Sequence, residues 1–232
     1  MKKLTTILAS FGLLFSILST NVSAFDGISF GGVWSTATID SSGTEEESNL
    51  VDAASETNST SKSTDADFGS YFIEYTSQAG HTFGMEFIPG EADIDSRSRV
   101  ETAVATASGG AENDTGTYTA KAQLSDHSTL YVEPTKMFSD TFGIYLKGGV
   151  SKVTIDVTQT GTTSLFADKD VYGVATGIGA KKFFGENVFV KLEYMETDYA
   201  SYSDVAMTTT TNSTVEADVD AEATRLSLGW NF

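Results

Sequence analysis

Few residues of this chain are of a type that could carry chemistry, and they are scattered. There are two histidines, His81 and His127, and no cysteine. His127 precedes Ser128, but serine hydrolysis also needs a base that a third group holds in place, and the sequence offers no such set. The sequence therefore predicts a protein that is not an enzyme, with no catalytic residue and no cofactor. An enzyme that modifies membrane lipid is the least favoured alternative, after the structural role and the porin described below.

Three acidic residues near the carboxyl end are a candidate metal site. Asp218, Asp220 and Glu222 are spaced by two, so they lie on one face of a strand. They lack the glycine and the bidentate glutamate of a calcium-binding helix–loop–helix. We predict a hydrated acidic rim without a defined metal site. Weak binding of Ca²⁺ or Mg²⁺ at acidic loops stays open.

The charge balance excludes one class of partner. The 232 residues carry 14 basic and 32 acidic side chains, a formal charge of -18. Proteins that bind nucleic acid carry basic patches, so no nucleic-acid partner is expected. The segment Ser41–Asp67 holds seven acids against Lys62 alone. We predict that it is a long, mobile, extracellular loop that is dispensable for folding.

The amino terminus has the pattern of an export signal. Lys2 and Lys3 precede a largely apolar stretch over 7–18, and the small residue Ala24 follows at a cleavage position. We predict a signal peptide over 1–24 and one barrel domain over 25–232. A second apolar run of spanning length does not occur, so a membrane form must be a closed barrel.

The last residues alternate strictly between apolar and polar. Leu226, Leu228, Trp230 and Phe232 are apolar, and the residues between them are small or polar. This period-two pattern indicates a strand with two unlike faces. Two aromatic residues on the apolar face are typical of a strand that faces lipid and ends at a membrane interface.

The same alternation recurs along the chain and predicts eight antiparallel strands. Long polar connections alternate with very short ones, as in outer-membrane barrels. Pro89 predicts a bulge in the third strand. Asp126 interrupts an apolar face of the fourth strand, which indicates either a bulge there or a position outside the membrane. A turn is expected at 137–140. The predicted strands cover about 26–38, 67–77, 83–107, 115–133, 141–157, 169–184, 188–203 and the segment after 215.

A soluble eight-stranded barrel or sandwich would show the same alternation with its apolar side chains inside. Export, the aromatic carboxyl end and the loop asymmetry together favour the membrane form. The expected fold is thus an all-β, transmembrane, up-and-down barrel.

Three segments add a resemblance. The run Tyr172–Ala180, the short turn Phe184–Asn187 and the strand Val188–Tyr194 resemble strands six and seven of small eight-stranded outer-membrane β-barrels. That family includes the membrane domain of outer membrane protein A, outer membrane protein X and many porin-family proteins. The resemblance implies that Leu226, Leu228, Trp230 and Phe232 are an assembly signal read by the barrel-insertion machinery. It specifies a fold and little about activity.

Seven charged side chains fall on the presumed inward faces of the strands. In a narrow barrel such charges must be paired or hydrated, and eight strands enclose a space that side chains can fill. We therefore expect a structural ion-pair network that plugs the lumen, with Arg225 beside Glu193. The members are Glu74, Glu86, Lys147, Lys181, Lys191, Glu193 and Arg225.

The sequence as a whole predicts a monomer in the outer membrane with both termini in the periplasm. Lipid and lipopolysaccharide are its expected neighbours. Its expected role is structural or one of surface interaction through acidic extracellular loops. The alternative is a small porin that passes ions or small solutes.

Overall fold

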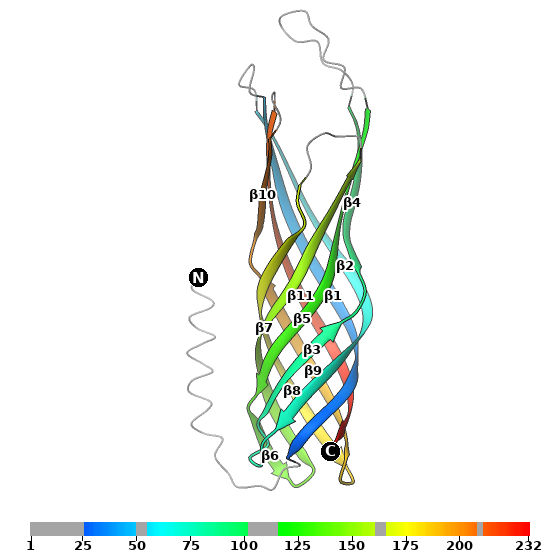
Figure 1. Cartoon of the computed structure of the whole chain (residues 1–232), viewed down its shortest axis with the longest axis vertical. Coiled ribbons are helices and arrows are strands. Elements are labelled where there is room, and N and C mark those ends of the chain that lie inside the picture. Colours follow the sequence, from blue (N-terminus) through cyan, green and yellow to red (C-terminus); the bar gives the residue numbers. More distant parts are fainter. Residues whose placement is uncertain (1–25, 50–54, 102–115, 161–165, 208–210) are drawn as a thin grey trace, which may run out of the picture.

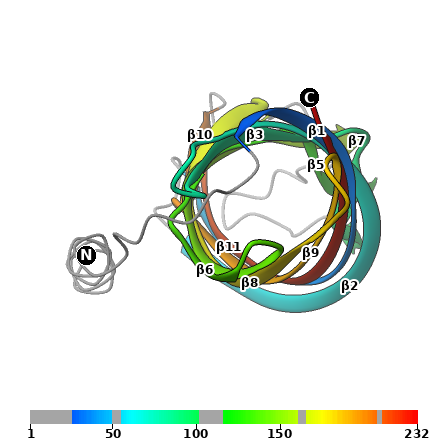
Figure 2. The ribbon, with the colours of Figure 1, turned by 90° about the horizontal axis from the view of Figure 1, so that it is seen from below.

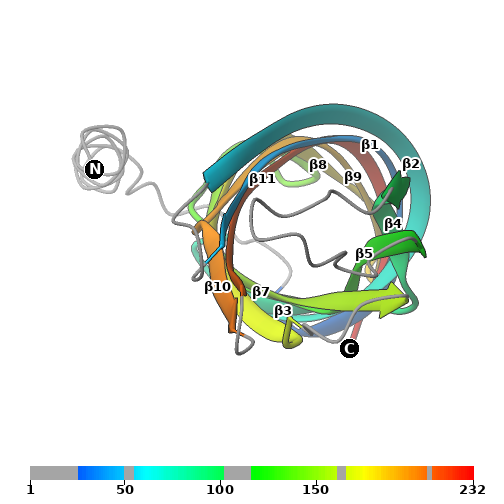
Figure 3. The ribbon, with the colours of Figure 1, turned by 90° about the horizontal axis from the view of Figure 1, so that it is seen from above.

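The computed structural model describes residues 26–49, 55–101, 116–160, 166–207 and 211–232. In these residues the chain forms a long antiparallel β-barrel (Figure 1). Viewed along its axis, the strands enclose a ring from below (Figure 2) and from above (Figure 3). The predicted signal peptide over 1–24 lies outside the described residues and stays a prediction.

Eleven strands are assigned in the described residues. Their bounds are β1 (Gly27–Asn49), β2 (Ser55–Thr76), β3 (Thr82–Ile88), β4 (Ala92–Glu101), β5 (Gly116–Glu133), β6 (Thr135–Ser139), β7 (Phe142–Thr160), β8 (Lys169–Phe184), β9 (Val188–Tyr199), β10 (Tyr202–Met207) and β11 (Thr211–Asn231).

The ring has eight members, which confirms the predicted strand number and topology. The ladder runs β1, β2, β3, β5, β7, β8, β9 and β11, and the pairing of β11 with β1 closes it. β4, β6 and β10 follow β3, β5 and β9 in the chain after short breaks. Within the described residues, no helix is long and apolar enough to cross a membrane.

The outer wall of the barrel is apolar, and this decides between the membrane and the soluble alternatives. On β1 the large side chains Ile28, Phe30 and Trp34 are more than half exposed, whereas Ser29 and Ser35 are buried inside. On β2, β3, β8, β9 and β11, large apolar side chains are likewise exposed on the outside while polar or charged side chains are buried inside. A soluble barrel would expose its polar face, so this arrangement matches a wall that faces lipid.

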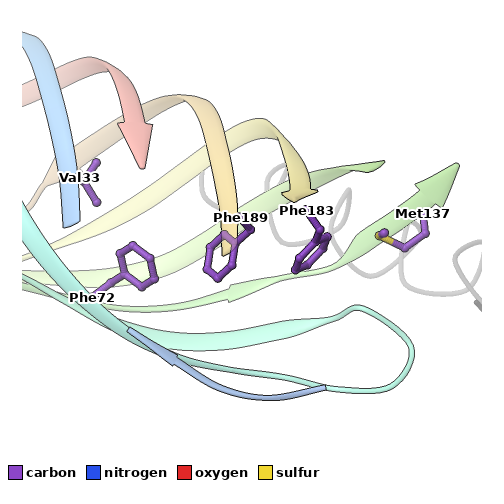
Figure 4. Packing of buried hydrophobic residues seen from close by; sticks show 5 residues of the cluster. All are labelled: Val33, Phe72, Met137, Phe183 and Phe189. Carbon is purple, nitrogen blue, oxygen red and sulfur yellow. The ribbon is translucent and has the colours of Figure 1, made fainter. Parts of the chain in front are cut away.

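Aromatic side chains fill part of the lower lumen. Figure 4 shows Phe72, Phe183 and Phe189 between Val33 and Met137. The ring centroids of Phe72 and Phe183 lie 6.1 and 5.6 Å from that of Phe189. The Phe189 ring covers Gly229 so closely that a Cβ there would overlap it, which explains why a glycine occupies this position.

The predicted mobile loop over Ser41–Asp67 is wrong for most of its length. β1 continues to Asn49 and β2 begins at Ser55, with an unbroken register between them. Each further rung adds backbone hydrogen bonds to a ladder that is already anchored, and serine and threonine tolerate the extended backbone. Thr36 and Thr38 also donate cross-strand hydrogen bonds to Asp67 and Asp65 (2.7 and 2.9 Å).

The predicted bulge near Asp126 is confirmed, whereas at Pro89 the strand is interrupted and not merely bulged. The chain leaves the ladder between Ile88 and Ala92, where Pro89 cannot donate a hydrogen bond. The register of β5 against β7 shifts between Ser125 and Ser128. Asp126 lies in this bulge with a φ of +49°, and its side chain is exposed.

Other strand ends differ from expectation. The expected turn at 137–140 is wrong, because β6 pairs with β7 beyond Pro134 and the chain turns at Asp140 and Thr141. β9 ends at Tyr199 and β10 begins at Tyr202, whereas one strand to 203 was expected. β11 begins at Thr211 and not after 215. The expected end of the third strand at 107 lies outside the described residues.

The upper part of the barrel divides into two extensions. Among the described residues, β4 pairs only with β5 and β10 pairs only with β11. β1 and β2 rise together with β11 and β10, and β4 and β5 rise with β7 (Figure 1). The chain thus extends as paired strands above the apolar wall.

Candidate functional site

Eight charged side chains meet in the lumen and form the candidate site, which we call the lumen network. All are 5% exposed or less, although they come from seven different strands. They comprise four acids and four bases, so the network is neutral in a chain of formal charge -18. Its members are Glu74 (β2), Glu86 (β3), Glu133 (β5), Glu193 (β9), Lys147 (β7), Lys181 (β8), Lys191 (β9) and Arg225 (β11).

The first half of the network is built on Glu74 and Glu133. Lys191 Nζ donates to a carboxylate oxygen of each, at 2.5 Å to Glu74 and 2.8 Å to Glu133. Lys181 Nζ lies 3.2 Å from Glu74 and 3.9 Å from Glu133. The Tyr131 hydroxyl also donates to Glu74 (3.0 Å). Each carboxylate in this half therefore faces more than one cation.

The second half is built on Glu193 and Glu86. Arg225 bridges them, with Nη1 2.9 Å from Glu193 and Nη2 in contact with Glu86. Ser70 Oγ donates to Glu86 (2.6 Å), and the Tyr145 hydroxyl donates to Glu193 (3.0 Å).

Lys147 joins the two halves. Its Nζ lies 3.0 Å from Glu193 and 3.4 Å from Glu133. On β1, Ser35 Oγ accepts a hydrogen bond from Arg225 Nε (3.3 Å). The connected set therefore includes at least one residue from every strand of the ring, so its bonds run across the lumen as well as around the wall.

Aromatic rings enclose the cations. Lys181 Nζ lies 4.9 Å from the Phe189 ring centroid, and Lys191 Nζ lies 5.3 Å from that of Phe72. Lys147 Nζ lies 4.1 Å from the ring centroid of Tyr131. These contacts favour the charged ammonium group and replace part of the hydration that it loses in the lumen.

All seven lumen residues that the sequence singled out are brought together in the structure. The expected contact between Arg225 and Glu193 is present, and the two residues are direct partners across β11 and β9. Glu133 was missed because Pro134 was interpreted as the end of its strand. Two signals could have revealed it. Glu133 is two residues from Tyr131, so the alternation places both side chains on the inward face. The seven predicted charges comprise three acids and four bases, so a neutral network needs one more acid.

The histidines make structural contacts. His81 Nδ1 accepts a hydrogen bond from the backbone N–H of Thr135 (3.2 Å) next to a lower turn. His127 Nε2 lies 2.7 Å from the Tyr199 hydroxyl inside the barrel.

The acidic residues Asp218, Asp220 and Glu222 share one face of β11, as their spacing predicts. All three are exposed. Ser201 donates a hydrogen bond to Asp218 (2.5 Å), and Tyr194 donates one to Glu222 (2.9 Å). In the described part of the chain, no three acidic or histidine side chains are placed to hold a metal ion.

The four carboxyl-terminal apolar residues all face outward. Leu226, Leu228, Trp230 and Phe232 are between 46% and 69% exposed. The Phe232 ring stacks on that of Phe30 with centroids 5.3 Å apart.

Comparisons with known proteins agree with this geometry. A family model described as outer membrane protein beta-barrel domain matches residues 11–232. The solved outer membrane protein OprG from Pseudomonas aeruginosa is similar, with a TM-score of 0.61 and 14% identity over 91% of this chain and 99% of that chain. At this identity the likeness concerns the fold.

Other solved barrels are more distant. Neisserial surface protein A gives a TM-score of 0.46 at 8% identity, over 85% of this chain and 97% of its own. The N-terminal barrel domain of Pseudomonas aeruginosa OprF gives 0.39 at 12%, over 85% and 97%. No curated protein sequence is similar enough to match this chain.

The contact between Arg225 and Glu193 can be tested by a double-mutant cycle. Arg225→Ala and Glu193→Ala should each lower the free energy of unfolding by about 3–5 kcal/mol, because each leaves a buried charge without its partner. The double change should cost less than the sum of the two. Urea unfolding of the refolded barrel in lipid vesicles would measure this.

The exposed pair Lys152–Asp170, with 2.8 Å between its charged atoms, is a matched control. Alanine changes there should show little coupling, because water already solvates both groups. Additive costs in the Arg225–Glu193 cycle would contradict the assignment of a coupled network.

Proposed function

Because the chain belongs to the outer membrane protein beta-barrel domain family, we propose that it is a closed, non-enzymatic barrel with a structural and surface-interaction role. The family and the apolar wall give its location, the outer membrane. The proposal adds that its lumen is sealed and that its paired-strand extensions above the membrane make its contacts. We propose that it acts as a monomer among outer-membrane lipid and lipopolysaccharide.

The neutral lumen network is the observation that carries this proposal. An eight-stranded barrel has an interior that side chains are able to fill. Here four cations and four anions occupy it, and the bonds between them cross from strand to strand. A conducting pore needs hydrated, accessible charges, whereas these side chains are buried and each lies within 4 Å of a charge of opposite sign. Among the described residues, Glu133 Oε1 has no hydrogen-bond donor and faces Lys147 Nζ at 3.4 Å. The same pairing argues against their use as general acids or bases.

The upper extensions would make the surface contacts. Their outward positions above the apolar wall are rich in carboxylates, namely Asp40, Asp65, Asp67, Glu196, Asp198, Asp218, Asp220 and Glu222. The exposed Asp93 carboxyl on β4 accepts hydrogen bonds from Lys121 and Gln123 on β5, and these bonds lower its pKa. A partner of these extensions would therefore be bound through polar and charged contacts.

Single-channel recording tests the sealed lumen. The refolded full-length protein should give no discrete current steps in a planar bilayer in which a general porin, as positive control, is readily seen. Lys147→Ala should leak more than the parent, because it removes the residue that joins the two halves of the network and leaves Glu133 and Glu193 to draw in water. Regular steps from the unaltered protein would favour the porin alternative.

We also propose that the lower end, with Gly27 and Phe232, faces the periplasm, and that the upper extensions face the outside. Two connections between ring strands at the upper end, from β3 to β5 and from β9 to β11, are longer than any connection at the lower end. Bacterial outer-membrane barrels have their longer loops outside and their short turns in the periplasm.

An epitope tag tests this orientation. Inserted within residues 50–54, which connect β1 and β2, the tag should bind antibody on intact cells. The same tag placed in the lower turn at Glu186 is the matched control and should be reached only after the outer membrane is permeabilised. The opposite pattern would show that the barrel is inserted the other way round.

The carboxyl-terminal residues would serve assembly. We propose that the outward face of Leu226, Leu228, Trp230 and Phe232 is the signal that the barrel-insertion machinery reads. Deleting Phe232 should lower the amount in the outer membrane without lowering secretion to the periplasm, whereas Phe232→Tyr should keep the aromatic ring and the signal. Unchanged membrane levels and heat-modifiable migration in the deletion variant would rule out this role.

A further inference from the structure

Two lysines interrupt the apolar outer wall near its lower end. The lower part of the outer wall comprises the outward positions of the described residues between the lower turns and one boundary residue on each of seven ring strands. These boundary residues are Trp34, Tyr71, Phe87, Val150, Tyr172, Tyr194 and Leu226. On the strands these positions are apolar, small or uncharged, except for Lys136 on β6 and Lys182 on β8. Both exceptions are cations, in a chain whose formal charge is -18. The exposed acids Asp140 and Glu186 lie in the turns below the strands, and Asp26 lies just before β1.

The register places the two lysines in one sector of the wall. Lys136 is the direct partner of Ile144 on β7, and Lys182 is the direct partner of Phe142 on the same strand. Two strand spacings and a two-residue offset put their Cα atoms roughly 12 Å apart. Two extended lysine side chains can therefore converge on one group between them. The site lies at the end of the barrel that carries β6 (Figure 1).

Aromatic side chains surround this sector. Phe138 and Phe184 are more than half exposed, and Phe142 is partly exposed. The ring centroids of Phe138 and Phe142 lie 6.3 Å apart. In outer-membrane barrels, girdles of aromatic residues flank the lipid-facing band at both of its edges. The lysines thus lie at headgroup depth, on the lower side of the wall.

A lysine that projects from a lipid-facing wall is costly unless its ammonium group reaches the interface. Its stem can lie along the apolar wall while the charged end extends toward the headgroups. Lys182 Nζ is directed to the lower turn, where it donates a hydrogen bond to Thr141 Oγ1 (2.8 Å). An ammonium group has further donors, and an interfacial phosphate supplies acceptors of opposite charge.

We propose that Lys136 and Lys182, with Phe138, Phe142 and Phe184, form a binding site for the phosphate headgroup of an anionic glycerophospholipid. The lipid is in the leaflet at the lower end, which is the periplasmic leaflet in the orientation given under the proposed function. The two ammonium groups hold the phosphate, and the rings pack against the upper part of the acyl chains. The site would select anionic over zwitterionic lipid and fix the depth of this sector.

Native mass spectrometry of the full-length barrel, released from bilayers of equimolar phosphatidylglycerol and phosphatidylcholine, tests the site. The unaltered protein should retain phosphatidylglycerol preferentially. In Lys136→Gln and Lys182→Gln the preference should fall about fivefold each, and in the double variant by roughly the product of the two. Lys152→Gln, which removes an outward lysine near the other end, is the matched control and should leave the preference unchanged.

Heat-modifiable migration in gel electrophoresis identifies the folded protein in each sample. If the double variant does not fold, the two single variants alone test the site. Equal phosphatidylglycerol retention by the unaltered protein and the folded variants would overturn the site. If lipid A, offered in a second bilayer, depended on the same lysines to the same extent, the assignment to a glycerophospholipid would be overturned. Conductance and tag exposure are separate readouts, so a failure of the proposed function is distinguishable from a failure of this site.

Discussion

The cost of removing charge from water is the constraint on which the rest of this structure depends. An isolated carboxylate or ammonium in the lumen would lose hydration free energy that no single neighbour could restore. The chain meets this constraint with equal numbers of acids and bases and with partners shared between them. Glu133 faces three lysines, and Arg225 faces two glutamates. Because these bonds connect all the strands of the ring, the network also ties the barrel together across its interior.

The interior, the outer wall and the upper extensions each carry a different pattern of charge, and each pattern matches what surrounds that part of the barrel. The interior is neutral and paired. In the described residues, the lower outer wall carries charge on its strands only at Lys136 and Lys182, the sector that we propose lies against lipid headgroups. The upper extensions are acidic on their outward faces, where water solvates the carboxylates. The net charge of the protein therefore resides mainly outside the membrane, where it weakens neither the lumen nor the contact with lipid.

Much of the fold could be predicted from period-two alternation, because each inward or outward position is set by parity. That rule gave eight ring strands and the seven lumen charges, and it located the bulge at Asp126, the residue that interrupts an apolar face. The prediction was wrong where it relied on amino-acid composition and did not consider which strands could pair. Ser41–Asp67 is polar enough for a loop, yet the anchored ladder of β1 and β2 continues through it.

The missed member of the network has a similar cause. Pro134 separates β5 from β6, and the fourth strand was predicted to end at Glu133, whose side chain was not placed in the lumen. In the structure β6 continues beyond the proline, so Glu133 stays inside. Strand parity is local information, whereas which carboxylate meets which lysine across the lumen depends on the tilt and closure of the whole ring.

The central claim is that the paired charges close the lumen to water from both sides, and a single labelling measurement tests it. The chain has no cysteine, so Ser35→Cys places one thiol beside Arg225, at a position that is fully buried. Ser42→Cys, at an exposed position of β1, provides the control. A small cationic methanethiosulfonate should label position 42 promptly in the folded barrel and leave position 35 unlabelled until the barrel is unfolded. Comparable labelling rates at both positions would contradict a lumen closed by paired charges.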